Sequence, residues 1–264
     1  MKTIAFATRK GGAGKTAVTF NVGGILAEQH NVLLMDYDPQ VNLTGNVGLD
    51  ITDQSAPSML NIFKDSASAT PERLISKSPI PELPKLDIIG GHLDMEDMEM
   101  QLVSKPAREF VVQRWIKKHR AYLERYDYIL FDTNPSTGLI NQNAFAAADA
   151  IVLVSDVSEE SRMGAMQFVY KWDKIREAYD IENNVKAMVM NNVDKRIGQA
   201  DQLQEYYADD EDFGPLLLKA TIPYRADMKR TSPNCMPINV LAPKSDACAA
   251  VRAVVEELKE RGVL

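Results

Sequence analysis

The sequence contains only two cysteines, Cys235 and Cys248, among 264 residues. Two cysteines are too few for a disulfide framework or a cysteine metal cluster, which favours a reducing, cytoplasmic compartment. No run of about 18 apolar residues occurs, so no membrane span is predicted. Arg9 and Lys10 interrupt the first apolar run, so no signal peptide is expected. With 14 glycines and 13 prolines, the composition excludes fibrous and disordered classes.

Basic residues are also in deficit, with 30 Lys and Arg against 37 Asp and Glu and a net charge of −7. That balance argues against a strongly basic nucleic-acid module. The acidity is local, however, because residues 201–213 contain six acids and no base. The segment from Gly214 onward is net positive, so the overall charge does not exclude a surface that faces DNA.

Short, continuous apolar runs recur along the chain with amphipathic stretches between them. Continuous rather than alternating apolar residues are typical of strands covered on both faces of a parallel sheet. The runs are Thr3–Ala7, Val32–Met35, Leu86–Ile89, Tyr128–Phe131, Ile151–Val154, Ala187–Met190, and Leu216–Leu218 with Thr221–Ile222. This alternation predicts an α/β fold with a doubly wound, mostly parallel sheet and helices on both faces.

Two segments bear on domain organisation. The proline-rich stretch Pro71–Pro84 is interpreted as a surface excursion between strands rather than a linker. The last amphipathic stretch begins at Ser245 or Asp246 and has an apolar stripe that we expect to pack on the body of the protein. One domain over residues 1–264 is predicted.

A glycine-rich loop, Lys10–Thr16, follows the first predicted strand. Glycines let backbone N–H groups converge on phosphate oxygens, and the following helix presents its positive end to the same anion. Lys15 is placed to reach the terminal phosphates and Thr16 to bind Mg²⁺. The ordinary loop has glycine where this chain has Arg9, and the alternative reading is a glycine-rich turn without a ligand. The strand before and the helix after favour a nucleotide.

Carboxylates follow two other predicted strands. Asp36 and Asp38 come directly after Val32–Met35, and Asp132 comes directly after Tyr128–Phe131. The carboxyl ends of parallel strands are where a doubly wound sheet binds ligands, and phosphoryl transfer needs a bound Mg²⁺ and an aligned water. The alternative is that Asp-Pro and Asn-Pro simply initiate turns.

Together these segments resemble the ParA/Soj partition ATPases, the deviant-Walker family that also contains MinD. The loop resembles the family's Lys-Gly-Gly-Val-Gly-Lys-Thr with Ala13 for valine. Asp36-Tyr37-Asp38-Pro39-Gln40 is similar to its Asp-x-Asp-Pro-Gln. Asp132-Thr133-Asn134-Pro135-Ser136 is similar to its Asp-x-Pro-Pro-Ser, with Asn134 replacing a proline. Weaker similarity extends over nearly the whole chain.

The resemblance implies a role for each matching residue. Lys10 is the signature lysine, which contacts ATP on the other subunit of a nucleotide-sandwich homodimer. Asp38 orients the attacking water, and Asp132 supports the Mg²⁺ shell. The implied catalytic residues are Lys10, Lys15, Asp38 and Asp132. Those around the metal are Thr16, Asp36 and Asp132. Those on the nucleotide are Gly11, Gly12, Ala13, Gly14, Lys15, Thr16 and Ala17, with Asn192 or Asn191, Pro223 and Tyr224 near adenine.

The resemblance also implies the partners: non-specific DNA and a ParB-like centromere-binding protein that stimulates hydrolysis, for a cytoplasmic, nucleoid-associated ATPase. Asp227 occupies the position of a DNA-binding arginine in the family, so the DNA contacts are less defined than the ATPase site. The candidates are Lys195, Arg196, Lys229, Arg230 and Lys244. A second basic stretch, Arg108 to Arg125, is interpreted as the solvated face of a helix buried through Phe110, Val111 and Trp115.

Two alternatives remain. A MinD-like ATPase that positions cargo on a membrane needs a basic, amphipathic C-terminal helix, whereas residues 254–264 carry mixed charges and no Phe or Trp. A metabolic P-loop enzyme, such as a small-molecule ligase, is the other. The leading hypothesis is a Mg-ATP-dependent, dimerising ATPase that drives partition of a plasmid, chromosome or mobile element.

Overall fold

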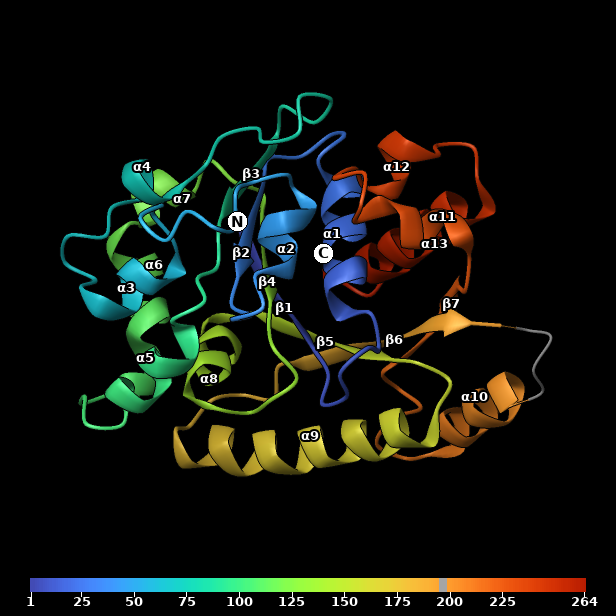
Figure 1. Cartoon of the computed structure of the whole chain (residues 1–264). Helices are drawn as coiled ribbons and strands as arrows, with labels where there is room; N and C mark the ends of the chain where they lie inside the picture. Colours follow the sequence, from blue (N-terminus) through green and yellow to red (C-terminus); the bar gives the residue numbers. More distant parts are fainter. Residues whose placement is uncertain (195–198) are drawn as a thin grey trace.

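Seven parallel strands form one sheet in the order β3-β2-β4-β1-β5-β6-β7 in the computed structural model, which describes residues 1–194 and 199–264 (Figure 1). Each predicted apolar run lies in a strand, and the two runs nearest the C-terminus contribute to a single strand. The strands are β1 Lys2–Ala7, β2 Val32–Asp36, β3 Leu86–Ile89, β4 Tyr128–Asp132, β5 Ala150–Ser155, β6 Val185–Val193 and β7 Leu217–Pro223. The predicted doubly wound α/β fold is confirmed.

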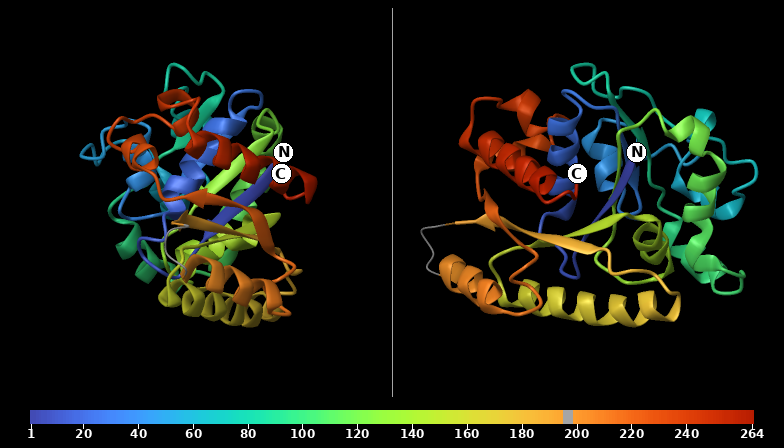
Figure 2. Two further views of the ribbon diagram at one scale, coloured as in Figure 1. Left: turned by 90° about the vertical axis from the view of Figure 1, so that its right-hand side faces the viewer. Right: turned by 180° about the vertical axis from the view of Figure 1, so that it is seen from behind.

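Helices cover both faces of this sheet (Figure 2). Among the described residues they are α1 Lys15–Leu26, α2 Asn42–Asn46, α3 Met59–Lys64, α4 Pro71–Leu74, α5 Met95–Leu102, α6 Val111–Lys118, α7 Arg120–Leu123, α8 Leu139–Ala147, α9 Glu159–Ala178, α10 Gln199–Asp209, α11 Ala226–Thr231, α12 Ile238–Leu241 and α13 Asp246–Glu260, with a 3₁₀ turn at Arg108–Phe110.

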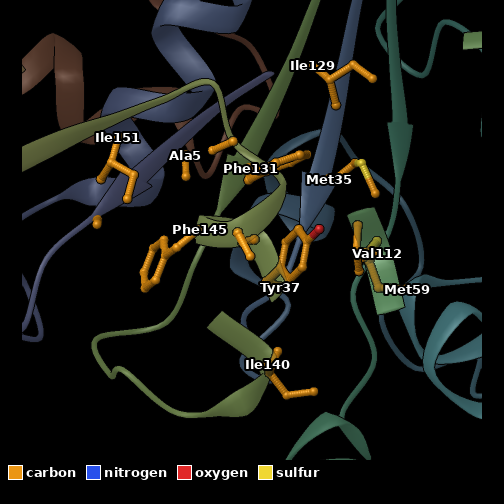
Figure 3. Close-up of a cluster of buried hydrophobic side chains, with 14 of the residues drawn as sticks. Ala5, Met35, Tyr37, Met59, Val112, Ile129, Phe131, Ile140, Phe145 and Ile151 are labelled. Carbon is orange, nitrogen blue, oxygen red and sulfur yellow. The ribbon is translucent and has the colours of Figure 1, made fainter. Parts of the chain in front are cut away.

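The core has two layers because successive side chains of each strand point to opposite faces. Ile4 and Phe6 of β1 pack with α1 and α13. Ala5 and Ala7 of the same strand pack with α3, α5, α6, α8 and α9. Figure 3 shows the second layer, where Tyr37 lies beside Phe131. The continuous apolar runs are thereby explained, since each strand is buried on both sides.

The C-terminal helix α13 begins at Asp246, directly after its N-cap residue Ser245. The Ser245 hydroxyl accepts a hydrogen bond from the Cys248 N–H at 3.1 Å, and Ser245 is the preferred kind of N-cap residue. The apolar stripe of α13 is buried, as are Val263 and Leu264. The stripe therefore packs on the body of the protein, as expected. No helix of the described residues is long and apolar enough to cross a membrane.

Two segments differ from expectation in detail. Pro71–Pro84 contains the short helix α4 and an antiparallel bridge between Ser76 and Ile88, so part of it is tied to the sheet. Arg108 to Arg125 is not one helix but a 3₁₀ turn, α6 and α7. The break lies at His119, which ends α6 and precedes α7. Trp115 and Val111 are buried there as predicted.

Other parts of the chain pair with backbone groups at both edges of the sheet. On β3, the N–H and C=O of Ile88 pair with Ser76 at 3.0 and 2.8 Å. On β7, the Glu257 carboxylate of α13 accepts hydrogen bonds from the N–H groups of Lys219 and Ala220 at 3.0 and 2.8 Å. Part of the backbone that each edge strand leaves open is thus paired.

Candidate nucleotide site

The predicted phosphate loop joins β1 to α1 at the carboxyl edge of the sheet. Gly12 and Gly14 have φ values of 87° and 84°, a conformation that side chains other than glycine rarely adopt. A Cβ on Gly14 would lie 2.2 Å from the amide nitrogen of Asn191. That amide donates to the Ala13 carbonyl at 2.8 Å. The loop is therefore braced by β6, and Gly14 is required for it.

Lys15, the first residue of α1, points into the protein. Its Nζ lies 2.8 Å from Oδ1 of Asp132, the last residue of β4, and the two side chains are 5% and 0% exposed. The other carboxylate oxygen of Asp132, Oδ2, is buried and has no hydrogen-bond partner. An unsatisfied buried oxygen is uncommon and indicates a missing ligand or water.

Whether the site fits Mg²⁺ can be judged from the unpartnered Oδ2 of Asp132. Mg²⁺ in nucleotide sites keeps one or two protein oxygens and takes the rest from phosphates and water. The described residues contain no cluster of three or more His, Cys, Asp or Glu that could hold a metal. Thr16 lines the loop cavity. Thr16 and Asp132 therefore suit a Mg²⁺ ion that enters the site together with the phosphates of a nucleotide.

Asp38 lies at the same cavity, which has a volume of about 340 Å³ and is also lined by Lys10, Lys15 and Thr16. Burial raises the pKa of Asp38, and the positive charge of Lys15 partly offsets this effect. The Gln40 N–H donates to its Oδ1 at 2.9 Å. A carboxylate held at the mouth of a phosphate cavity is suited to orient a water or accept its proton.

Asp36 has different surroundings from Asp38. Its Oδ2 accepts from the N–H and hydroxyl of Thr44 at 2.9 and 2.7 Å, and its Oδ1 accepts from the Asp38 N–H at 3.1 Å. Burial, together with the charge of Asp132, raises the pKa of Asp36 to about 7. These contacts make Asp36 a brace for the Asp38 turn. Its predicted contact with Mg²⁺ stays a prediction.

Lys10 contacts residues that sequence reasoning missed. Its Nζ lies 2.9 Å from Oδ2 of Asp156 and 2.6 Å from Oγ of Ser158. Asp156 comes directly after β5, as Asp38 comes soon after β2. The same signal, a carboxylate at the carboxyl end of a strand, was therefore available in the sequence. Lys10, which the resemblance implies to be the signature lysine, is held by its own chain in this structure.

Of the residues predicted near adenine, Pro223 and Tyr224 line a second, larger cavity, whereas Asn191 and Asn192 do not. Pro223 ends β7, Tyr224 follows it, and both border a space of about 740 Å³. Asn192 has a left-handed φ of 57°. Its amide nitrogen lies 3.6 Å from where a Cβ on Gly14 would be. The strand that leads to the second cavity therefore also reaches the phosphate loop. Ala17 is half-buried in the first turn of α1, and Gly11 and Gly12 are exposed.

Three of the candidate DNA contacts follow β7 in the sequence and lie on the surface. Lys229 and Arg230 of α11 and Lys244 are exposed. Lys229 contacts the Tyr224 hydroxyl, and Arg230 lies 3.3 Å from Asp227. Lys195 and Arg196 lie outside the described residues.

Comparison with known proteins agrees with this geometry. The family model described as "AAA domain" matches residues 1–187, more than half of the chain. The chromosome partitioning protein ParA of Myxococcus xanthus is 27% identical over 268 residues, covering 98% of this chain and 88% of that protein. The chain belongs to the ParA-type P-loop ATPases.

Solved structures share the fold of this ParA-type ATPase. Apo McdA from Cyanothece superposes with a TM-score of 0.81 at 20% identity, covering 98% of this chain and 99% of that one. Cobyrinic acid a,c-diamide synthase from Mycobacterium smegmatis, bound to an ATP analogue and magnesium, superposes with a TM-score of 0.80 at 21% identity, covering 99% and 96%. The fold alone therefore does not separate partition from small-molecule synthesis.

Asn134 of this ParA-type chain stands where the resemblance implies a proline, and the structure shows how this residue is held. The Asn141 amide donates to the carbonyl and to the side-chain oxygen of Asn134, both at 2.8 Å. The Asn141 side-chain oxygen also accepts the Asn134 N–H at 3.2 Å, and Asn141 is fully buried. The loop after Asp132 is therefore fixed by hydrogen bonds from α8.

Proposed function

We propose that this chain is a Mg-ATP-dependent partition ATPase that dimerises on ATP, binds DNA non-specifically as the dimer, and releases it after hydrolysis. The observation that carries the proposal is the convergence of Lys10, Lys15 and Asp38 on one cavity beneath a glycine loop. A second lysine beside the ordinary phosphate lysine suits a site completed by another subunit.

Each residue has a role in this proposal. The loop N–H groups from Gly11 to Thr16 hold the phosphates, and Thr16 and Asp132 hold Mg²⁺, which neutralises charge on the transferred group. Asp38 orients the attacking water. Pro223 and Tyr224 border the space for the base. Lys15 would exchange its contact with Asp132 for phosphate, which frees the carboxylate for the metal shell.

The sandwich arrangement places Lys10 of each copy on the nucleotide of the other, where a cation stabilises charge that develops in the transition state. Lys10→Ala is expected to abolish stimulated hydrolysis while leaving nucleotide binding by the monomer intact. Mixing it with Lys15→Ala chains should restore turnover in one composite site. If no mixing ratio restores turnover, Lys10 does not act in trans.

DNA binding follows from pairing two copies. Affinity for the phosphate backbone rises steeply with the number of cations presented together, and it falls steeply with salt. Lys229, Arg230 and Lys244 are the exposed candidates, and Lys195 and Arg196 are further ones. The decisive experiment measures DNA retention with ATP, with ADP and without nucleotide, at low and moderate salt. Equal affinity in all three states would reject the proposal.

A ParB-like partner is proposed to stimulate hydrolysis at the nucleoid. Asp38→Ala should then give a dimer that stays on DNA with ATP, because the attacking water is no longer positioned. Fast release by this variant would remove Asp38 from that role. Retention on anionic vesicles rather than on DNA would favour the MinD-like alternative, and a metabolite that raises ATP turnover would favour a synthase.

A further inference from the structure

A cavity of about 230 Å³ lies apart from the two spaces assigned to the nucleotide. Its walls come from residues 41–58, from residues 73–76 at the end of α4, and from residues 90–93 after β3. None of its lining residues borders the phosphate cavity or the space for the base. Because it is smaller than the phosphate cavity alone, it suits a small organic molecule rather than a second nucleotide.

The wall of this cavity combines apolar side chains with one buried hydroxyl. Val41, Leu49 and Leu74 supply apolar surface. Ser58 lines the same space and is 3% exposed, and its Oγ is buried without a hydrogen-bond partner. A buried hydroxyl without a partner is uncommon and indicates a missing ligand or water. An apolar pocket that contains a few polar groups is the usual form of a small-molecule site.

Arg73 of α4 brings a positive charge to the cavity. Its guanidinium has no hydrogen bond or ion pair to any residue that the structure describes. A guanidinium presents parallel N–H groups that match the two oxygens of a carboxylate. The side of the cavity that Arg73 lines therefore suits a carboxylate.

Two carboxylates also line the cavity, and both are exposed. Asp50 accepts hydrogen bonds from the N–H and hydroxyl of Thr52 at 2.8 and 2.7 Å. Asp53 accepts from the N–H and hydroxyl of Ser55 at 2.9 and 2.6 Å. These hydrogen bonds lower the pKa of both carboxyls, so both are ionised at neutral pH. Neither has a cationic partner among the described residues, so a positive group is favoured beside them.

We infer that this cavity binds a free amino acid with an apolar side chain. The carboxylate of such a ligand pairs with Arg73, and its ammonium group pairs with Asp50 and Asp53. Its side chain packs against Leu49 and Leu74. A ligand with only one of the two charges would leave the groups for the other charge unpaired. The inference goes beyond the proposed function, and the binding site does not depend on it.

Thr44 connects this cavity to the residue proposed to orient water. Thr44 lines the cavity, and its hydroxyl donates to Oδ2 of Asp36 at 2.7 Å and accepts from the Gly91 N–H at 2.8 Å. Oδ1 of Asp36 accepts from the Asp38 N–H at 3.1 Å. A ligand packed against Thr44 would therefore restrain the turn that carries Asp38.

The test compares three probes that share a phenyl body. L-phenylalanine carries both charges, 3-phenylpropanoate lacks the ammonium group, and phenethylamine lacks the carboxylate. Saturation-transfer NMR measures their binding to the full chain, without nucleotide and with Mg-ADP to fill the nucleotide site. Phenylalanine is expected to bind about tenfold more tightly than either truncated probe. Equal binding of the three probes would overturn the inference, as would no binding of phenylalanine or leucine at about 10 mM.

Two variants change the cavity itself. Arg73→Gln should weaken phenylalanine binding to the level of phenethylamine and leave phenethylamine binding unchanged, because only the carboxylate uses Arg73. Ala56→Leu should fill the cavity, which Ala56 lines, and abolish binding of all three probes. Lys64→Gln is the matched control, since it removes the same charge from an exposed helix position that does not line the cavity. An equal loss in this control, or unchanged phenylalanine binding in Arg73→Gln, would contradict the site.

Phosphate release tests the connection through Thr44. Bound phenylalanine is expected to raise the hydrolysis rate about threefold, since it holds the Asp38 turn in place. In Thr44→Val, phenylalanine should still bind but no longer change the rate. If phenylalanine binds to the parent chain without changing its rate, the connection is overturned and the binding site stands. If phenylalanine binds to a chain that binds no nucleotide, the proposed function fails and the binding site stands.

Discussion

The Nζ of Lys10 lies 2.9 Å from Oδ2 of Asp156 in the same chain. The lysine proposed to reach the nucleotide of a second copy is thus engaged within its own subunit, and closing the dimer requires this contact to break in both copies.

Asp156→Asn should therefore promote dimerisation. The pair is partly exposed, so its loss is worth about 0.7 kcal/mol per subunit. Over two subunits the ATP-bound dimer should tighten about tenfold, as measured by analytical ultracentrifugation across a concentration series. Glu160→Gln, an exposed neighbour on α9, is the control. A weaker dimer in Asp156→Asn would show that Asp156 supports the closed state instead.

Lys15→Ala should destabilise the fold as well as abolish nucleotide binding. Removing Lys15 leaves the Asp132 carboxylate buried without a counter-charge, which costs about 3 kcal/mol. Urea unfolding of the nucleotide-free protein measures the loss. Adding Asp132→Asn should recover most of the stability but none of the binding. Equal stability of Lys15→Ala and the parent chain would contradict a buried ion pair.

Asn141→Ala should loosen the loop after Asp132. The Asn141 amide forms hydrogen bonds with Asn134. Its removal leaves the polar groups of Asn134 unsatisfied, which should cost about 2 kcal/mol of unfolding free energy. Because the loop carries no phosphate-binding glycine, we expect nucleotide affinity to be retained and the hydrolysis rate to fall. Gln142→Ala, whose amide donates to the Thr137 carbonyl, is the control. Loss of affinity with unchanged turnover would contradict this assignment.

Glu257 predicts a dependence of stability on pH. Burial opposes its ionisation, but hydrogen bonds from the Ala220 and Lys219 N–H groups and from Arg261 outweigh burial and lower its pKa. A carboxylate with a lowered pKa stabilises the fold above its unfolded pKa, and this contribution is lost as the pH falls through the folded value. Glu257→Gln should cost about 1 kcal/mol at pH 7.

The difference in stability between Glu257→Gln and the parent chain should shrink as the pH falls below about 4. Thermal unfolding of both proteins across pH measures it, with Glu260→Gln as the exposed control. A difference that is constant with pH would assign the effect of Glu257 to packing rather than to charge.

Much of this structure could be predicted because its signals are local. Continuous apolar runs mark every strand, and glycines mark the phosphate loop. Because Asp38 and Asp132 follow the carboxyl ends of predicted strands, both could be predicted to lie at one edge of the sheet. The sequence marks Asp156 as a carboxylate that follows a strand, but it does not indicate which side chains pair. The pairs are Lys10 with Asp156, between the segments that follow β1 and β5, and Asn141 with Asn134. Each is a single hydrogen-bonded arrangement, which no periodicity specifies.

The bridge between Ser76 and Ile88, together with Glu257 at the opposite margin, has a consequence for assembly. A row of open backbone groups invites a neighbouring molecule to extend the sheet, as in fibrous aggregates. Here the chain itself pairs with part of each margin, at Ile88 of β3 and at Lys219 and Ala220 of β7. The proposed ATP-bound dimer is therefore expected to form through side chains and bound nucleotide rather than by extension of the sheet, so hydrolysis can reverse its formation.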